Sequence, residues 1–225
     1  TGGINAPVRK VCVLSAKSVS EPRKGLYIYD LGQEIAGVPR IRFFGSAGET
    51  ATVRYGEMLY PELAEYGSLH GLMLTDNYRD AESIDKYILS GDAEGEVFCP
   101  RFTFHGFRYI EISGVENAPG LADVQGIQLS SVPEITGKIE TSDKLLNRFI
   151  ENVRWSMLCN FISIPTDCPQ RNERIGWAGD THVFCRTATY EADTRLFYLR
   201  YLDDFRDLQE EDGRLPNIAP IGGGF

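Results

Sequence analysis

The sequence lacks the features that would point to a membrane or a nucleic acid. No stretch approaches the roughly 18 consecutive apolar residues of a membrane-spanning helix, and the opening "TGGINAPVRK" lacks the basic-then-apolar order of a secretion signal. The formal net charge is −9 and no cluster of Lys and Arg occurs, whereas phosphate backbones are bound by clustered basic residues. We therefore expect neither a membrane nor a nucleic acid as a partner, and a neutral ligand such as a sugar agrees with this charge.

The cysteines show no pattern of a disulfide framework or a zinc site. They are odd in number, include no CxxC pair and have no histidine at metal-ligand spacing. Most lie in apolar surroundings, where a free thiol behaves as a small hydrophobic group. We therefore expect structural thiols and no metal or other cofactor; the five are Cys12, Cys99, Cys159, Cys168 and Cys185.

The length of 225 residues is enough for one large domain or two ordinary ones, and two is the better expectation. Hydrophobic residues make up 42% and charged residues 24%, which is typical of a chain that folds into a globular core. Both ends, "TGGINAP" and "PIGGGF", look like cut points within a longer protein. The lack of a targeting signal therefore indicates no particular compartment, and the oligomeric state is left open as well.

The first part of the chain, from residue 8 to about 132, has the pattern of short β-strands separated by turns. The runs are rich in Val, Ile, Tyr, Phe and Thr and nearly alternate in polarity, which is typical of strands with one buried face. The clusters "GSAGE" and "SGDAEG" mark turns between them. Seven or eight such strands without intervening helices predict an antiparallel β-sandwich; the runs are "VRKVCVL", "GLYIYDL", "VPRIRFF", "ATVRYGEML", "DKYILSG", "FRYIEI" and "DVQGIQL".

The second part changes to helical spacing. Apolar residues recur every three or four positions and predict helices over about 142–162, 179–191 and 193–211, with Ser142 as the first N-cap. Three such helices do not complete a core of an obvious type. Either they form a small bundle packed on the sandwich, or they begin a larger helical domain that continues past Phe225.

The connection "PTDCPQRNERIGWAGD", residues 165–180, holds more chemistry than a helix-to-helix loop needs. Glycosidic cleavage needs a carboxylic acid and a carboxylate on opposite sides of a sugar ring, so Asp167, Glu173 and Asp180 are candidates. Trp177 offers an aromatic face for the apolar side of a sugar.

A scaffold role explains the same residues. Arg171 and Arg174 would then pair with the neighbouring acids to fix a helix entrance, and Asp180 would be a cap or a first-turn acid. Residue types alone leave both roles open. Outside the loop, His105 is expected to be a structural histidine, and Glu57 and Glu111 are expected on solvated strand faces; His182 is left out of the site.

The loop also resembles a known family. "PTDCPQRNERIGWAGD", continued by "THVFCRTATY" and later "DGRLPNIAP", is similar to the signature region of the bacterial α-L-rhamnosidases of glycoside hydrolase family 78. Upstream, "YDLGQEIAGVPRIRFFGSAGETATVRYGEML" and "PRFTFHGFRYIEISG" resemble the β-domain that precedes the catalytic domain in that family. The resemblance covers nearly the whole chain.

This resemblance implies a fold, a reaction and a site. It implies a β-sandwich over residues 1–135 followed, over 136–225, by the first helices of an (α/α)6 barrel that removes terminal α-L-rhamnose with inversion and without a cofactor. Glu173 would be the general acid, and the rhamnose subsite would be lined by Asp167, Arg171, Trp177 and Asp180. Asn172 and Ala178 stand where many members have Asp and Thr, which bears on fine specificity rather than on catalysis.

The resemblance also implies that half of the acid–base pair is missing from this chain. The family's general base is a second glutamate farther downstream, and an inverting mechanism places it about 6.5 to 9.5 Å from the acid. We therefore expect the 225-residue chain to be inactive by itself. Two alternatives remain at this point, a carbohydrate-binding or interaction module without catalysis and a different glycosidase, lyase or phosphorylase on the same barrel.

Overall fold

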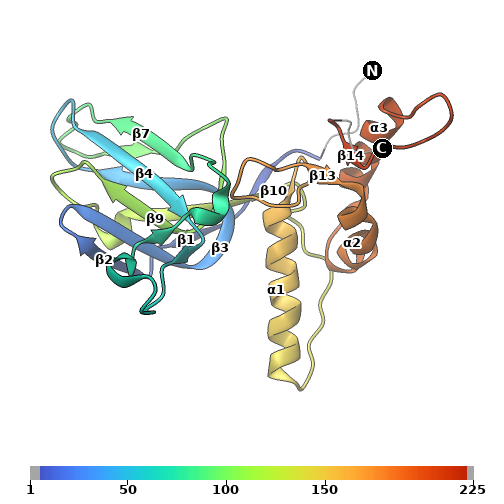
Figure 1. Ribbon diagram of the computed structural model, residues 1–225, viewed down its shortest axis with the longest axis horizontal. Helices are drawn as coiled ribbons and strands as arrows, with labels where there is room; N and C mark the ends of the chain where they lie inside the picture. The colour runs from blue at the N-terminus through green and yellow to red at the C-terminus, as the bar shows by residue number, and fades with distance from the viewer. Residues whose placement is uncertain (1–5, 222–225) are drawn as a thin grey trace. The chain divides into compact units, whose positions relative to one another are not determined.

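The structure is a computed structural model that describes residues 6–221 (Figure 1). Its contacts divide the chain into two compact units. The unit named here the sandwich unit consists of Cys12–Gln128 together with the short segment Gln170–Asn172. The helical unit consists of the residues up to Val11, of Leu129–Pro169 and of the chain from Glu173 onward. None of the described helices is long and apolar enough to cross a membrane.

The sandwich unit is built on one antiparallel, sandwich-like arrangement of strands, as the alternating pattern predicted. Six strands follow one another in the order β1-β10-β3-β9-β4-β7, and β2 and β8 both pair with β3. The pairings of β3 with four of these strands, and of β4 with β7 and β9, are antiparallel. The strands are β1 (Arg9–Ser15), β2 (Ser18–Arg23), β3 (Leu26–Phe43), β4 (Thr50–Gly56), β7 (Ile84–Ile88), β8 (Glu96–Phe98), β9 (His105–Ser113) and β10 (Val124–Ser130).

The long strand β3 corrects one detail of the sequence prediction. The runs "GLYIYDL" and "VPRIRFF" were expected as two strands, but they form a single strand of 18 residues. Its pairing with β9 is interrupted between Asp30 and Ile35, where Gly32 adopts a φ of +74°. Its first part pairs with β2, and its last part pairs with β8 and β10. A local irregularity that keeps the strand going has therefore replaced the expected turn.

The core of the sandwich unit follows from the alternation of the strands. In β4, Ala51, Val53 and Tyr55 are fully buried, and β9 contributes residues such as Phe107 and Ile110 to the same core. Two-residue periodicity places the three β4 side chains on one face, and Tyr55 lies opposite Ile110 in the pairing of β4 with β9. The ring of Tyr55 stacks on His105, with 4.0 Å between the ring centroids.

The expectation for His105 is confirmed, and the one for Glu111 is wrong. His105 is buried, and its Nε2 lies 3.1 Å from Oδ2 of Asp85, so it is a structural histidine. Glu111 is not solvated: it is only 2% exposed, and its carboxylate accepts a 2.7 Å hydrogen bond from Arg54 of β4. Strand alternation predicts which side chains share a face, but it does not tell whether a buried carboxylate has a cation across the sheet.

Smaller elements complete the sandwich unit. A short hairpin joins β5 (Met58–Leu59) to β6 (Met73–Leu74). Three short 3-10 helices lie in the connections: η1 (Gly67–Leu69), η2 (Asp76–Tyr78) and η3 (Leu121–Asp123).

The helical unit contains the three predicted helices, α1 (Lys144–Asn160), α2 (Ala178–Glu191) and α3 (Arg195–Asp207). The N-cap of α1 is Asp143 rather than Ser142, because Oδ1 of Asp143 accepts hydrogen bonds from the backbone N–H groups of Leu145 and Leu146 at 2.8 and 3.3 Å. A carboxylate at this position also interacts favourably with the helix dipole. Helix α3 ends at Asp207, earlier than the pattern indicated.

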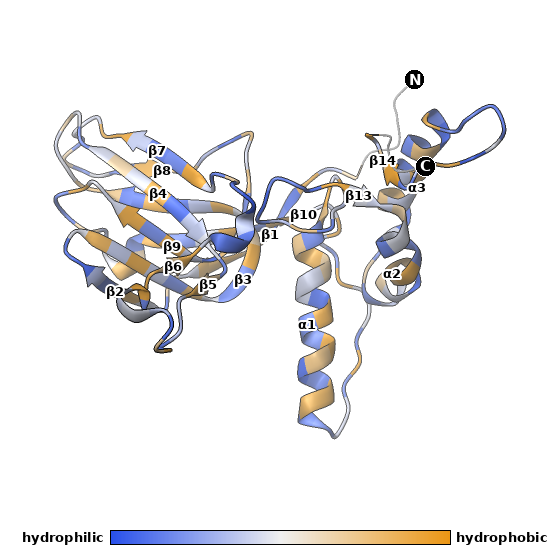
Figure 2. Cartoon of the chain, in the orientation of Figure 1, coloured by the Kyte–Doolittle hydropathy of each residue, from blue (hydrophilic) through white to orange (hydrophobic). Residues whose placement is uncertain are grey.

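The helices bury only part of their apolar surface within the described residues. Phe161 stacks on Phe197 with 4.5 Å between the ring centroids, in a small core that also includes Val132, Met157 and Ala188. Figure 2 shows further apolar segments along the helices. Many of these side chains are exposed in the described part of the chain, at 79% for Leu145, 62% for Phe149, 80% for Val183 and 55% for Leu202.

Candidate active site

The acid-rich loop starts from a tight turn after α1. Strand β11 (Phe161–Ile162) pairs with β12 (Ile164–Pro165) across Ser163, which adopts a left-handed φ of 66°. The backbone N–H of Ser163 donates a 2.9 Å hydrogen bond to Oγ of Ser131. A non-glycine residue persists in this conformation when its surroundings hold it. The turn therefore fixes the direction in which the chain enters the loop.

Asp167 closes the loop against Ile175. Its backbone N–H donates to the Ile175 carbonyl at 3.1 Å, and its Oδ1 accepts the Ile175 backbone N–H at 2.9 Å. One residue thus supplies both a backbone and a side-chain partner to the same residue eight positions later. The scaffold role considered for Asp167 is therefore present in the structure, through these two hydrogen bonds with the Ile175 backbone.

The far end of the loop is held by a short ladder. Strand β13 (Gly176–Trp177) pairs with β14 (Ile218–Ala219), and the Gly176 carbonyl accepts a 2.8 Å hydrogen bond from the hydroxyl of Tyr201. A Cβ added to Gly176 would lie 2.5 Å from the Ala219 carbonyl oxygen and 2.8 Å from the Tyr201 hydroxyl. Only glycine fits this close approach. The segment "NIAP" after α3 therefore belongs to the support of the loop.

Glu173 is held by Trp177. The indole Nε1 donates a 3.1 Å hydrogen bond to Oε1 of Glu173, and both side chains are half-buried. Indole N–H groups that leave water usually find such an acceptor. The bond fixes the glutamate head and the plane of the indole ring relative to each other.

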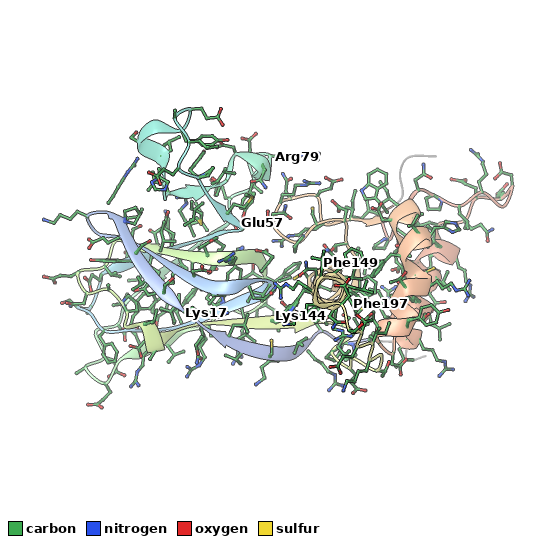
Figure 3. The ribbon with its side chains drawn as sticks, turned by 90° about the horizontal axis from the view of Figure 1, so that it is seen from below. Lys17, Glu57, Arg79, Lys144, Phe149 and Phe197 are labelled. Atoms are coloured by element: carbon green, nitrogen blue, oxygen red, sulfur yellow. The ribbon has the colours of Figure 1, made fainter. Side chains whose placement is uncertain are left out.

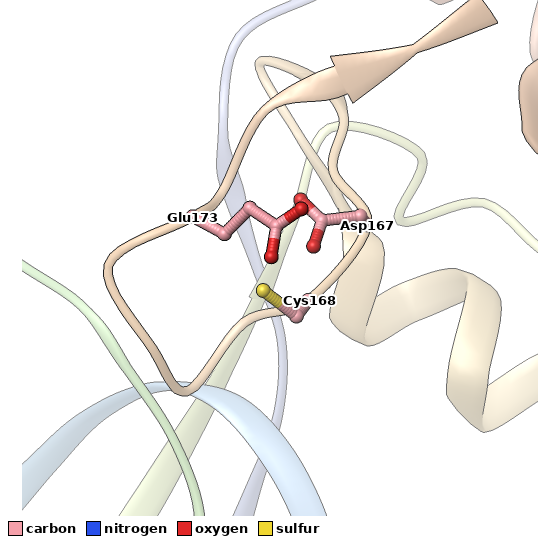
Figure 4. A group of neighbouring side chains, drawn as sticks. All are labelled: Asp167, Cys168 and Glu173. Atoms are coloured by element: carbon pink, nitrogen blue, oxygen red, sulfur yellow. The ribbon is translucent and has the colours of Figure 1, made fainter. Parts of the chain in front are cut away.

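Three side chains gather at the centre of the loop. Asp167, Cys168 and Glu173 each place a carboxylate oxygen or a sulfur atom within 4.8 Å of the others' (Figure 4). Among residues 6–221, these three are the His, Cys, Asp or Glu residues whose ligand atoms lie close enough together to hold a metal ion. Cys168 is 5% exposed and its thiol is free of disulfide bonding. It was expected as a structural thiol, and its position beside Asp167 in the sequence is the only signal for its place here.

A cavity of about 630 Å³ in the helical unit is lined by Asp167 and Asp180. Asp180 lies in the first turn of α2, is exposed and is not the cap, since Trp177 is the N-cap residue. Glu173 and Trp177 are not among the residues that line this cavity, whose walls also include aromatic residues. Asp167 thus belongs both to the cluster with Glu173 and to the cavity; the other walls come from Ser156, Met157, Asn160, Phe161, Pro165, Thr166, Gly179, Thr181, Val183, Phe184 and Tyr198.

The two arginines of the loop differ in their surroundings. Arg171 belongs to the sandwich unit with Gln170 and Asn172, whereas the other four predicted site residues belong to the helical unit. Arg174 has a left-handed φ of 44°, and burial lowers the pKa of its guanidinium, an effect opposed by the nearby Cys168 thiol. From the sequence, a partly desolvated arginine could not be distinguished from an arginine in an ordinary surface ion pair.

Comparison with known proteins identifies relatives over the whole described length. The sequence model of the bacterial alpha-L-rhamnosidase concanavalin-like domain matches residues 20–130. That of the bacterial alpha-L-rhamnosidase 6 hairpin glycosidase domain matches residues 134–224. An alpha-L-rhamnosidase of Streptomyces avermitilis is 40% identical over 220 residues, covering 98% of this chain and 20% of that protein. One of Alteromonas sp. is 37% identical over 218 residues, covering 96% of this chain and 22% of that protein.

Solved structures of alpha-L-rhamnosidases are also similar to this chain. The Streptomyces avermitilis alpha-L-rhamnosidase complexed with L-rhamnose matches with a TM-score of 0.90 and 38% identity, over 99% of this chain and 21% of that one. The alpha-L-rhamnosidase from Dictyoglumus thermophilum matches with a TM-score of 0.88 and 36% identity, over 95% of this chain and 23% of that one. The chain thus spans 20 to 22% of the two curated relatives described above.

Proposed function

Because the chain belongs to the bacterial α-L-rhamnosidase family of glycoside hydrolases, we propose that it forms part of an enzyme that removes terminal α-L-rhamnose, with Glu173 as the general acid. The observation that carries this proposal is the joint position of Glu173, its indole donor Trp177 and the Asp167 carboxylate in one loop. The L-rhamnose bound to the Streptomyces avermitilis relative supports the choice of sugar.

The geometry suits proton donation. A general acid must carry its proton when the glycosidic oxygen leaves. Asp167 places a carboxylate oxygen within 4.8 Å of the Glu173 carboxyl group, so a second acidic side chain lies beside the proposed acid. The Trp177 hydrogen bond holds the Glu173 head in one orientation, so that the proton points in a fixed direction.

The remaining predicted residues would bind the sugar. Asp167 and Asp180 line one cavity, and its volume of about 630 Å³ lies within the usual range of small-molecule sites. In this proposal they accept hydrogen bonds from ring hydroxyls, Arg171 donates to the sugar, and Trp177 forms an apolar wall. The natural substrate class is a rhamnoside, either a small glycoside or a polysaccharide.

The chain would divide near residue 135, with a β-sandwich domain over 1–135 and the beginning of an (α/α)6 barrel over 136–225. The exposed apolar side chains of the three helices, Leu145 and Val183 among them, support a larger helical assembly. In this proposal the rest of the barrel carries the general base of an inverting mechanism, about 6.5 to 9.5 Å from Glu173.

The test compares the full-length protein with the 225-residue chain on a panel of aryl glycosides. We expect the full-length protein to cleave the α-L-rhamnoside in preference to the other sugars, and the chain alone to release no rhamnose. Preference for another sugar would refute the substrate, and hydrolysis by the chain alone would refute the missing base. Binding of rhamnose without any hydrolysis by the full-length protein would favour a carbohydrate-binding module.

A further inference from the structure

We propose that Glu57, in the sandwich unit, is a positioning residue for the loop that carries the general acid. It would hold the segment Gln170–Asn172, which immediately precedes Glu173 in the chain. This inference rests on the proposed function of Glu173. It assigns to a residue of the sandwich unit a role in orienting the proposed acid.

The backbone at Glu57 is firmly held. Gly56, the last residue of β4, approaches β6 so closely that an added Cβ would lie 2.3 Å from Cγ and Sδ of Met73. The next N–H, that of Glu57, donates a 3.0 Å hydrogen bond to the hydroxyl of Tyr78, whose side chain is only 1% exposed. The residue therefore leaves the end of β4 in a fixed direction, at a point where the backbone of β4 packs closely on the Met73 side chain.

The Glu57 carboxylate is half-buried rather than solvated as the strand pattern had indicated. Its Oε2 accepts a 3.3 Å hydrogen bond from Nδ2 of Asn77, in the 3-10 helix η2. Figure 3 labels Glu57 and Arg79, the residue that follows η2. A carboxylate that loses water in this way needs partners, because a buried charge without them is costly.

Two of these partners come from the active-site loop. The side chain of Gln170 hydrogen-bonds to the Glu57 carboxylate, and the positive charge of Arg171 acts on the same group. Burial raises the pKa of Glu57, while Asn77, Gln170 and Arg171 counteract that rise by favouring the ionised form. The contacts join residues of the sandwich unit, since Gln170–Asn172 belongs to it.

The contact with Glu57 affects Glu173 because of its position along the loop. The loop is closed at its ends by the pairing of Asp167 with Ile175. Between these ends, the contacts of Gln170 and Arg171 with Glu57 leave only Asn172, Glu173 and Arg174 before the pairing resumes, and Arg174 is held in a left-handed conformation. A short segment fixed on both sides restricts the backbone of Glu173, which keeps the acid near its productive orientation.

The same contact bears on Arg171, which we propose as a sugar-binding residue. A carboxylate within electrostatic reach orients a guanidinium and offsets its desolvation. Removing the negative charge of Glu57 should therefore disturb both the orientation of Glu173 and the binding of the sugar by Arg171. The two effects separate kinetically, because the first depends on the leaving group and the second does not.

The experiment uses the full-length protein with Glu57→Gln and Glu57→Ala, and with Glu62→Gln as the matched control. Glu62 is exposed in the same unit, so its substitution changes the charge without touching the loop. Hydrolysis is measured on dinitrophenyl α-L-rhamnoside, whose leaving group needs little protonation, and on methyl α-L-rhamnoside, which needs it fully. Thermal unfolding shows that each variant is folded.

We expect both Glu57 variants to lose about tenfold or more in kcat on the methyl rhamnoside, and at least severalfold less on the dinitrophenyl rhamnoside. The Ala variant should be the more affected, and Glu62→Gln should equal the wild type. Equal losses on both substrates, or no loss, would overturn the positioning role. A wild-type protein that cleaves neither rhamnoside would instead refute the proposed function, and with it this inference.

Discussion

The indole Nε1 of Trp177 donates a 3.1 Å hydrogen bond to Oε1 of Glu173. This bond joins the last residue before α2 to the candidate acid four positions earlier, and so connects the start of a helix to the loop of residues 165–180. It also gives the tryptophan two roles in the proposed site, as an apolar wall and as a donor that orients the acid.

Removing only the donor should therefore be costly. Trp177→Phe keeps an aromatic ring but loses Nε1, and we expect kcat on a rhamnoside with a poor leaving group to fall about tenfold, the value of a hydrogen bond to a carboxyl group. Steady-state kinetics of the full-length protein measures this. Trp155→Phe is the matched control, since it removes an indole from helix α1, outside the loop segment 165–180. A Trp177→Phe enzyme as active as this control would contradict the orienting role.

Gly176 should not tolerate a side chain. A Cβ there meets the Ala219 carbonyl oxygen at 2.5 Å, so we expect Gly176→Ala to lower the free energy of unfolding by about 1 to 3 kcal/mol, the usual cost of overpacking. Gly179→Ala serves as the control, because a Cβ added there would have no neighbouring atom within 4 Å and alanine favours the helix. Denaturant unfolding of the full-length protein compares the two; equal stability would show that β13 and β14 adapt to the methyl group.

Stability should depend on pH through Glu34 of β3. Burial raises the pKa of this carboxyl to about 9 from 4.5, the neighbouring Glu57 charge adds to the rise, and Arg108 opposes it. A raised pKa means that the folded state favours the protonated form, so this contribution is fully present below about pH 4.5 and is lost as the pH rises towards 9.

Glu34→Gln replaces the protonated carboxyl with a neutral group that does not ionise. We expect the variant to gain stability relative to the wild type as the pH rises from 5 to 9, by at most about 1.4 kcal/mol per pH unit. Thermal or denaturant unfolding across this range measures the difference. A constant difference between the two proteins at all pH values would show that Glu34 ionises normally in the folded state.

Most of the secondary structure followed from local patterns. The alternation of β4 and β9 and the helical spacing of α1 to α3 reflect which faces are buried, and periodicity reports burial directly. The continuity of β3 through Gly32 was not predicted, because a polar, glycine-containing stretch looks the same in a turn and in an interrupted strand. The cap at Asp143 was missed by one residue for a similar reason, since Ser142 is equally suited by type.

The site was only partly predictable. Residue types and family resemblance selected Asp167, Glu173 and Trp177, which the structure brings into one loop. They did not reveal that Oδ1 of Asp167 accepts a hydrogen bond from the Ile175 backbone. Nor did they reveal that the Cys168 thiol lies close to the carboxyl groups of Asp167 and Glu173. Such contacts depend on how the loop closes, and no spacing in the sequence encodes that. Glu57 was missed because two of its partners, Gln170 and Arg171, lie more than 100 positions away, in the loop segment that belongs to the sandwich unit.

The most direct test of the account is Glu173→Gln in the full-length protein, measured on methyl α-L-rhamnoside together with the affinity for rhamnose. General-acid catalysis typically contributes about 10² to 10⁴-fold, so we expect turnover to fall by that order while the dissociation constant of rhamnose stays nearly unchanged. A variant that hydrolyses this substrate at close to the wild-type rate would contradict the assignment of Glu173 as the acid.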